Sequence, residues 1–242
     1  MNPQASLEFE DPPVIERVSR RARRIRLHVR PDGGVVLTIP QRASRSAAYQ
    51  FLEQNRAWIA RQHAKRRTQS VPRVLRWDGS DRLPLRGREL VIEMIASSLR
   101  KPVARFDADA VRIHASPATK PERLRRALVD ALREETAREA KILLDEESAR
   151  LGISYREISI RDPRSRWGSC SADGRIMLSL RLLLAPAEVF RYVAIHELCH
   201  LRWRGHGPRF WGLVAQQMPE FETQRAWLRR HGDELQGLLA SE

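Results

Sequence analysis

The sequence predicts an α+β protein, in which a basic, β-rich N-terminal part precedes a domain built mainly from helices. Three observations predict this class: apolar residues alternate in short runs before residue 115, helical periodicity begins after Pro121, and no segment repeats. The resulting order of strands, helix, strand and helix is typical of α+β folds. We therefore expect a flexible tail (1–13), a basic β-rich region with one helix (14–115) and a second domain (116–242).

The N-terminal region begins with a predicted strand pair, whose strands carry apolar residues at every second position and flank a turn with two glycines. The alternating residues are Ile25, Leu27 and Val29, then Val35, Leu37 and Ile39. Ser44 is a predicted helix N-cap, and the apolar face of that helix extends to about Gln62. A basic connector (64–73) and short strands, including 89–95 and 103–114, complete the region.

The second domain begins with a long predicted helix that should contribute to the core. Pro121 stands in its first turn, apolar residues recur at helical spacing to about Arg150, and Gly152 lies just past its end. The elements expected after it are strands at 153–160 and 175–180, a helix at 187–201 and two helices within 209–239.

Basic charge is concentrated toward the N-terminus. The chain has a net charge of +14, and residues 1–105 hold 22 Lys and Arg against 10 Asp and Glu. Such an excess favours anionic partners, such as nucleic acid, nucleotides or acidic proteins. The alternative is that arginine simply serves as the solubilising residue of this surface.

Composition also limits where the protein acts. No run of about 18 apolar residues is present, which argues against a membrane-spanning helix. The N-terminal residues lack the apolar core of a secretory signal. Only two cysteines occur, Cys170 and Cys199, which argues against a disulfide framework. We therefore expect a cytoplasmic protein with no membrane partner.

The segment AIHELCHLRWRGHGPRFW carries a metal-binding pattern. His196 and His200 are four residues apart on a predicted helix, so both imidazoles lie on one face and can share one ion. Glu197 is rotated by about 100° on the helix, which suits a general base beside the open position of the metal. We expect Gly205 and Gly207 to permit a chain reversal that brings in His206 as third ligand.

Three imidazoles with an open fourth position suit the tetrahedral preference of zinc. Manganese, cobalt and nickel also accept imidazole, so the spacing predicts a divalent ion and favours Zn²⁺ among the candidates. The expected chemistry is hydrolysis by a zinc-bound water that Glu197 activates.

The stretch from about Arg161 to Glu220 resembles the YgjP-like metallopeptidase family, which is related to the SprT and WLM groups of zincins. The matching text comprises RSRWGSCS, RIMLSLRLLLAP, VAIHELCHL and HGPRFW followed by MPEF, and RRARRIRLHVRPDGGVVLTIP is similar to the family's β-rich start. The resemblance implies a zincin-like catalytic domain (116–242) with an HExxH active-site helix. It implies His196, His200 and His206 as ligands and Glu197 as base.

Three further residues are candidates for contacts with substrate or with the metal ligands. Tyr192 lies one helical turn before His196 and is either an oxyanion donor, a support for the ligands or a packing residue. Arg166 and Ser169 belong to the RSRWGSCS loop, which either meets substrate or is packed onto the metal helix by Trp167 and Cys170.

The strand at Ile176 to Leu180 also allows two interpretations. If it lies beside the metal helix with a free edge, that edge can pair with an extended peptide; the alternative is an ordinary interior strand.

Peptide-bond hydrolysis is the leading hypothesis for function. The first alternative is metal-dependent hydrolysis of nucleotide phosphoanhydrides, for which the basic segments would supply phosphate contacts. Others are a protease that docks on nucleic acid through the basic N-terminal part and a nucleic-acid-binding module with a structural metal. The open ligand position argues against the last, because structural zinc sites are closed.

Overall fold

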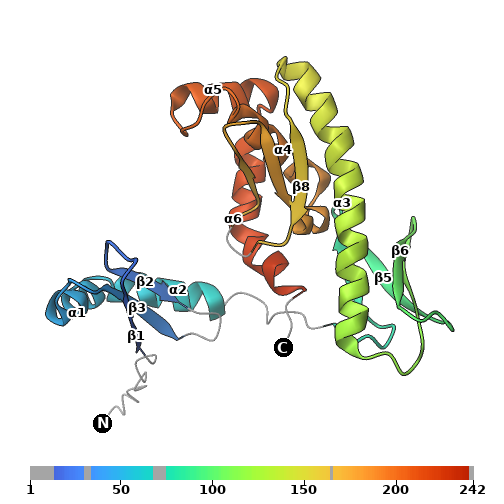
Figure 1. The fold of residues 1–242 in the computed structure, drawn as a ribbon, viewed down its shortest axis with the longest axis horizontal. Helices are drawn as coiled ribbons and strands as arrows, with labels where there is room; N and C mark the ends of the chain where they lie inside the picture. The colour runs from blue at the N-terminus through green and yellow to red at the C-terminus, as the bar shows by residue number, and fades with distance from the viewer. Residues whose placement is uncertain (1–13, 30–33, 68–74, 164–165, 240–242) are drawn as a thin grey trace, which may run out of the picture. The chain divides into compact units, whose positions relative to one another are not determined.

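The computed structural model describes residues 14–29, 34–67, 75–163 and 166–239, and side chains are described outside 63–67. The chain forms two compact units, unit 1 (Met1–Val71) and unit 2 (Pro72–Glu242). Both units mix helices and small sheets, so the fold is α+β as expected (Figure 1).

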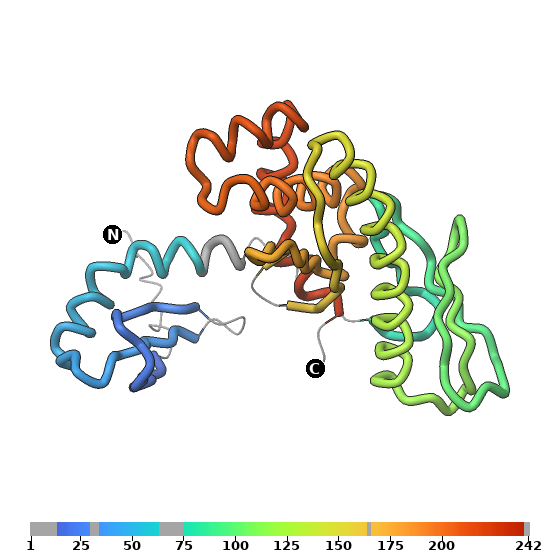
Figure 2. The backbone as a smooth tube through the Cα atoms, turned by 45° about the horizontal axis from the view of Figure 1, so that its top comes forward, coloured from blue at the N-terminus to red at the C-terminus, as the bar shows by residue number. Residues whose placement is uncertain are grey.

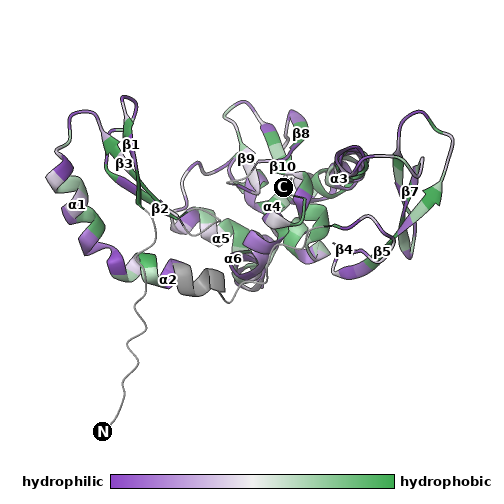
Figure 3. Cartoon of the chain, turned by 90° about the horizontal axis from the view of Figure 1, so that it is seen from below, coloured by the Kyte–Doolittle hydropathy of each residue, from purple (hydrophilic) through white to green (hydrophobic). Residues whose placement is uncertain are grey.

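Unit 1 is a three-stranded sheet with two helices. Its elements are β1 (Val14–Ser19), β2 (Arg26–Val29), β3 (Val35–Pro40), α1 (Arg45–Gln54) and α2 (Arg56–Arg67). β2 pairs antiparallel with β3, which confirms the predicted strand pair, and β1 adds a parallel strand on the other edge of β3. Most of the turn predicted between β2 and β3 lies outside the described residues. In Figure 3, hydrophobic residues follow the strands and hydrophilic residues the exposed turns of α1.

The helical part of unit 1 differs from the single predicted helix. Ser44 is the N-cap as expected, and its hydroxyl accepts a hydrogen bond from the Ala47 amide at 3.1 Å. The helix then stops at Asn55, whose side chain donates to the Phe51 carbonyl at 2.7 Å. A second helix, α2, begins at Arg56 and takes up the first part of the predicted connector.

Unit 2 starts with a four-stranded sheet in the order β4-β5-β7-β6. Its strands are β4 (Arg82–Leu85), β5 (Arg88–Ala96), β6 (Val103–Phe106) and β7 (Ala110–Ala115). The predicted strand at 103–114 is therefore a hairpin of two strands. The long helix α3 (Pro121–Leu151) follows, with proline in its first turn and Gly152 in the left-handed conformation at its end, as expected.

The sheet β4–β7 belongs to the same unit as α3, whereas the sequence suggested a boundary after residue 115. Leu83 and Ile92 of the sheet share one core with Leu128 of α3, and both views show α3 running along the sheet (Figures 1 and 2). Arg86, in the β4–β5 turn, forms ion pairs with Glu135 and Glu139 of α3. The apolar face of this sheet needs a cover, and α3 supplies it.

The third sheet has the order β8-β10-β9, formed by β8 (Glu157–Arg161), β9 (Gly168–Cys170) and β10 (Arg175–Ser179). β10 pairs with β8 on one side and β9 on the other, so of the two interpretations of this strand the structure supports the interior strand. The edge beside the metal helix belongs to β9, a short strand within the loop predicted between the two strands.

The remaining elements are helical: η1 (Leu180–Leu184), a 3-10 helix, then α4 (Ala187–Cys199), α5 (Pro208–Gln217) and α6 (Phe221–Gly237). Buried polar contacts fix two of them. Glu147 of α3 accepts a hydrogen bond from Arg191 of α4 at 2.7 Å. Arg181 of η1 pairs with Asp162 and donates to the carbonyls of the last turn of α6 at 2.8 and 2.9 Å. None of the helices described here has the length and apolar character needed to cross a bilayer.

Candidate metal centre

Three histidines converge at the C-terminal end of α4. His196 lies in its last turn, His200 caps the helix, and His206 comes from the loop before α5. One ring nitrogen of each lies within 4.8 Å of the others, and the Nε2 atoms of His196 and His206 are 3.1 Å apart. The structure thus brings together the three side chains that the sequence singled out.

This spacing fits one tetrahedral ion. Metal–nitrogen bonds of about 2.0–2.1 Å require ligand nitrogens about 3.3 Å apart, close to the His196–His206 separation. The Nδ1 of His200 lies 3.0 Å from the Trp203 carbonyl, which fixes a tautomer with the proton on Nδ1 and leaves the Nε2 lone pair for an ion. The residues present therefore fit a divalent metal.

Burial favours the neutral form of His196 and His200, and a metal ligand must be neutral imidazole. Removal from water, followed by repulsion from His200 and His206, lowers the pKa of His196 to about 3. Burial likewise lowers the pKa of His200. Phe210 of α5, itself fully buried, lies against all three rings with centroids 4.6 to 4.9 Å away, so an apolar wall supports the cluster.

The chain reversal before His206 does not depend on glycine conformation, contrary to expectation. Neither Gly205 nor Gly207 has a positive φ, and a Cβ atom at either position would meet nothing within 4 Å. The reversal instead follows from the end of α4, where amides of residues 201–203 bond back to the carbonyls of Leu198 and Cys199.

Glu197 lies beside the histidines and outside the cluster of potential ligands. Its side chain is nearly buried, at 5% exposure, and burial raises its carboxyl pKa to about 8 against the opposing effect of Arg166. β9 approaches it closely at Gly168, where a Cβ atom would lie 2.5 Å from the Glu197 Oε1. The absence of a side chain at this position makes room for the carboxylate.

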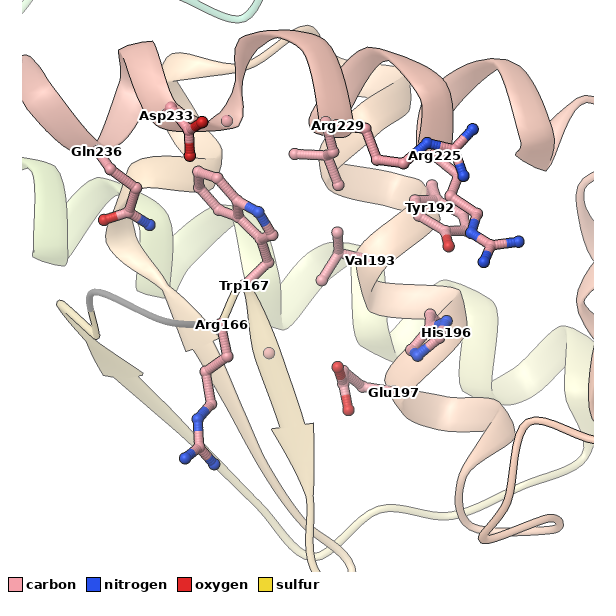
Figure 4. A pocket seen from close by; sticks show the side chains of 13 residues that line it. Arg166, Trp167, Tyr192, Val193, His196, Glu197, Arg225, Arg229, Asp233 and Gln236 are labelled. Carbon is pink, nitrogen blue, oxygen red and sulfur yellow. The ribbon is translucent and has the colours of Figure 1, made fainter. Parts of the chain in front are cut away.

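A cleft of about 480 Å³ opens beside this group, between α4, α6 and the start of β9 (Figure 4). Arg166, Tyr192, His196 and Glu197 all line it, so two of the three further candidates lie at the site. Ser169 does not; it lies on β9, opposite Met177 of β10. The remaining lining residues are Trp167, Gly168, Val193, Arg225, Leu228, Arg229, Gly232, Asp233 and Gln236.

Sequence analysis missed the contribution of α6. Arg225, Arg229 and Gly232 follow one another at helical spacing and face the cleft, a pattern that is visible in the sequence but did not suggest a site. Gly232 packs on Trp167, because a Cβ there would lie 3.2 Å from the indole. Trp167 therefore packs the loop onto α6, a contact that neither of the two interpretations of this loop included.

The two cysteines do not supply a nucleophile. Burial raises the pKa of the Cys170 thiol to about 11, and Cys199 is fully buried inside α4 with its pKa raised to about 12. Both thiols are therefore protonated near neutral pH, in keeping with the expected packing roles.

A family model of the YgjP-like metallopeptidase domain matches residues 23–231 of the chain. The chain belongs to the YgjP-like family. As a member of that family it is a metal-dependent peptidase, and the family resemblance drawn from the sequence is confirmed.

Two solved structures are also similar to part of this YgjP-like chain. The metallopeptidase zymogen of Pyrococcus abyssi abylysin is 26% identical, covering 42% of this chain and 99% of that one, with a TM-score of 0.36. The metallopeptidase zymogen of Methanocaldococcus jannaschii jannalysin is 20% identical, covering 36% and 94%, with a TM-score of 0.32. Comparison with curated proteins gave no match.

Proposed function

We propose that this YgjP-like protein is a zinc metallopeptidase in which His196, His200 and His206 hold the ion and Glu197 is the general base. The observation that carries the proposal is the meeting of three imidazole nitrogens within 4.8 Å of one another, beside a buried carboxylate. A zinc ion held there would act as a Lewis acid on the scissile carbonyl and lower the pKa of a coordinated water.

Glu197 would take a proton from the attacking water and return it to the leaving amine. Its position supports this role, because it lines the cleft next to His196 without belonging to the ligand cluster. Its burial supports it as well, since a carboxylate removed from water holds a proton more readily than an exposed one.

The peptide would lie extended along β9. Only one edge of β9 is paired within the described sheet, and Gly168 brings that strand against Glu197. A substrate strand added there would gain main-chain hydrogen bonds, with Ser169 beside it. Tyr192, across the cleft, would donate its hydroxyl hydrogen to the developing oxyanion, while Arg166 would orient the peptide near Glu197.

A paired substrate assay tests this proposal. Zinc-loaded wild-type protein is incubated with casein and, in parallel, with nucleoside triphosphates. We expect peptide cleavage, about one zinc per chain, and no cleavage by a Glu197→Gln variant that retains its zinc. Turnover of triphosphates alone would favour phosphoanhydride hydrolysis, and cleavage by the Glu197 variant would remove the proposed base.

We also propose that unit 1 binds nucleic acid. Arg17, Thr38 and Arg26 lie side by side across β1, β3 and β2, and both arginines are exposed. The apolar residues Leu37 and Ile39 point to the other face, where they are buried. A row of guanidinium groups on an open sheet face suits a phosphate backbone.

The salt dependence of DNA binding tests this second proposal. For each phosphate neutralised, log K should fall by about 0.9 per unit of log salt concentration. We expect Arg17→Gln together with Arg26→Gln to reduce this slope, and Arg230→Gln in unit 2 to leave it unchanged. Equal slopes in all three proteins would contradict the proposal.

A further inference from the structure

Two arginines of α6 face the cleft beside the metal centre. Arg225 and Arg229 are four residues apart, so they project from one side of the helix, and both line the cleft together with Tyr192 and His196 of α4 (Figure 4). Both are exposed, so an incoming ligand can reach them.

Neither arginine is neutralised within the described part of the chain. No carboxylate there forms an ion pair with Arg225 or Arg229, although many other arginines of the protein have such partners. Two guanidinium groups at one helical turn repel each other. An anion between them would relieve that repulsion and accept hydrogen bonds from both.

The position of this pair is fixed by aromatic and backbone contacts. The guanidinium of Arg225 lies 4.6 Å from the ring centroid of Trp211, which favours a stacked cation. Arg181 holds the last turn of α6 through the carbonyls of Leu235 and Gln236. The helix that presents the arginines is therefore anchored, and the Arg225 side chain is partly ordered by its contact with Trp211 before any ligand arrives.

The fields of both arginines reach the reacting end of the cleft. Both side chains line the cleft together with Tyr192 and His196, so their positive charge acts on that end of the cleft. A negatively charged group bound by the arginines would thus sit next to Tyr192, close to where we propose that the scissile carbonyl lies.

We infer that Arg225 and Arg229 form a subsite for a carboxylate of the peptide substrate. The carboxylate comes either from an acidic side chain near the scissile bond or from the C-terminus of the peptide. Arginine suits this task because its planar donors match the two oxygens of a carboxylate. The inference rests on the proposed peptidase function and adds a preference for acidic substrates.

Matched peptides test the subsite with the full-length protein. Three sets of fluorescein-labelled decapeptides carry Glu, Gln or Lys on both sides of a degenerate centre, each with a free or an amidated C-terminus. Cleavage of the zinc-loaded enzyme is followed by mass spectrometry and kcat/KM. Binding to the zinc-loaded Glu197→Gln variant is followed by anisotropy, so the subsite is measured without turnover.

We expect the Glu set to exceed the Gln set by about tenfold in kcat/KM and in affinity, which corresponds to about 1.4 kcal/mol. A Glu-over-Gln preference that survives amidation identifies the acidic side chain as the ligand, whereas weaker cleavage and binding of the amidated than of the free peptides within the Gln set identifies the terminal carboxylate. The double variant Arg225→Gln, Arg229→Gln should lose the preference, so that its kcat/KM and its affinity become equal for the Glu and Gln sets.

Two controls separate charge from folding. Arg230→Gln alters an exposed arginine of the same helix that does not line the cleft, so it should keep the preference. The double variant Arg225→Lys, Arg229→Lys retains the charge and should restore part of the preference for the Glu set. Zinc content is measured in every variant.

Equal cleavage and equal binding of the Glu and Gln sets together with no effect of amidation, or an unchanged preference in the double Gln variant, would overturn the subsite. Absence of cleavage in every set would instead count against the peptidase function. The anisotropy measurement would still decide whether the arginines bind a carboxylate.

Discussion

At the scale of single residues, the close approach of Gly168 to the Glu197 carboxylate leaves no room for a side chain at position 168. A methyl group added by Gly168→Ala would lie 2.5 Å from the Glu197 Oε1 and would displace either the carboxylate or β9. Because misplacement of a catalytic group by about 1 Å can cost about 10²-fold, we expect kcat/KM to fall by that order with zinc content unchanged. Gly207→Ala, where the added methyl meets nothing, is the control. Equal activity of both variants would contradict the contact.

The protonation of Glu197 predicts a pH effect on the metal-free protein. Burial raises its pKa from 4.5 to about 8, so the folded state holds the proton more tightly than the unfolded chain. The contribution of this proton to the free energy of unfolding is fully present below about pH 4.5 and is lost as the pH rises through about 8. Glu197→Gln removes this dependence. Urea unfolding of chelator-treated protein at pH 5 and pH 9 should show a smaller stability loss at pH 9 in the variant; identical losses would count against the burial.

The histidine cluster was predictable from sequence because its members lie within eleven residues of one another. His196, Glu197 and His200 share a helical turn, so their relative directions follow from the helix itself. Gly168, Arg225 and Arg229 reach the site through tertiary packing, and no local spacing joins them to the histidines. Tyr192 and Arg166 could be identified as candidates from sequence, because Tyr192 lies one helical turn before His196 and Arg166 belongs to the RSRWGSCS motif.

At the scale of elements, the contacts of the buried Arg181 hold α6 in place and can be tested by substitution. This arginine is 5% exposed and joins Asp162 to the last turn of α6. Removal of Arg181 leaves the carbonyls of Leu235 and Gln236 without their donor. It also leaves Asp162, whose side chain is 29% exposed, without its partner. A buried acceptor left unpaired costs about 1–3 kcal/mol. We expect Arg181→Ala to lower the free energy of unfolding of unit 2 by this amount in urea titrations.

Arg230→Ala is the matched control, since this arginine is exposed on the same helix. We expect a change within about 0.5 kcal/mol for that surface position. A similar loss in both variants would show that Arg181 does not anchor α6.

Elements that begin or end at a capping residue, a proline or a glycine were predicted well, and elements whose bounds depend on tertiary packing were not. Pro121 and Gly152 delimit α3, and Ser44 begins α1, because each imposes a local conformation. The stop at Asn55 and the three-residue strand β9 depend on side-chain and cross-strand contacts that a local pattern does not encode. The pairing of β10 on both sides likewise follows from β9, which the sequence presents as loop.

At the scale of the whole molecule, each unit has its own hydrophobic core. Leu37, Ile39 and Ala48 are buried together in unit 1, whereas the core of unit 2 includes Leu128 and Leu198. Leu37→Ala should therefore destabilise unit 1 by about 2–5 kcal/mol and leave the zinc content and peptide cleavage unchanged.

Leu128→Ala in unit 2 is the contrasting variant, and we expect it to lower the stability of the unit that holds the metal centre. Circular dichroism during urea unfolding, combined with metal analysis, distinguishes the effects of Leu37→Ala and Leu128→Ala. Loss of zinc on Leu37→Ala would show that the metal centre depends on the core of unit 1.

The end of α4 at Cys199, with His200 as its cap, has an electrostatic consequence for the ion. The aligned peptide dipoles of a helix leave a partial negative charge at its C-terminus, equivalent to about half an electron. The three imidazoles gather at that pole, so the backbone itself would draw a cation toward them. Part of the attraction for the ion is thus built into the peptide units of the helix and would survive any substitution that preserves its last turn.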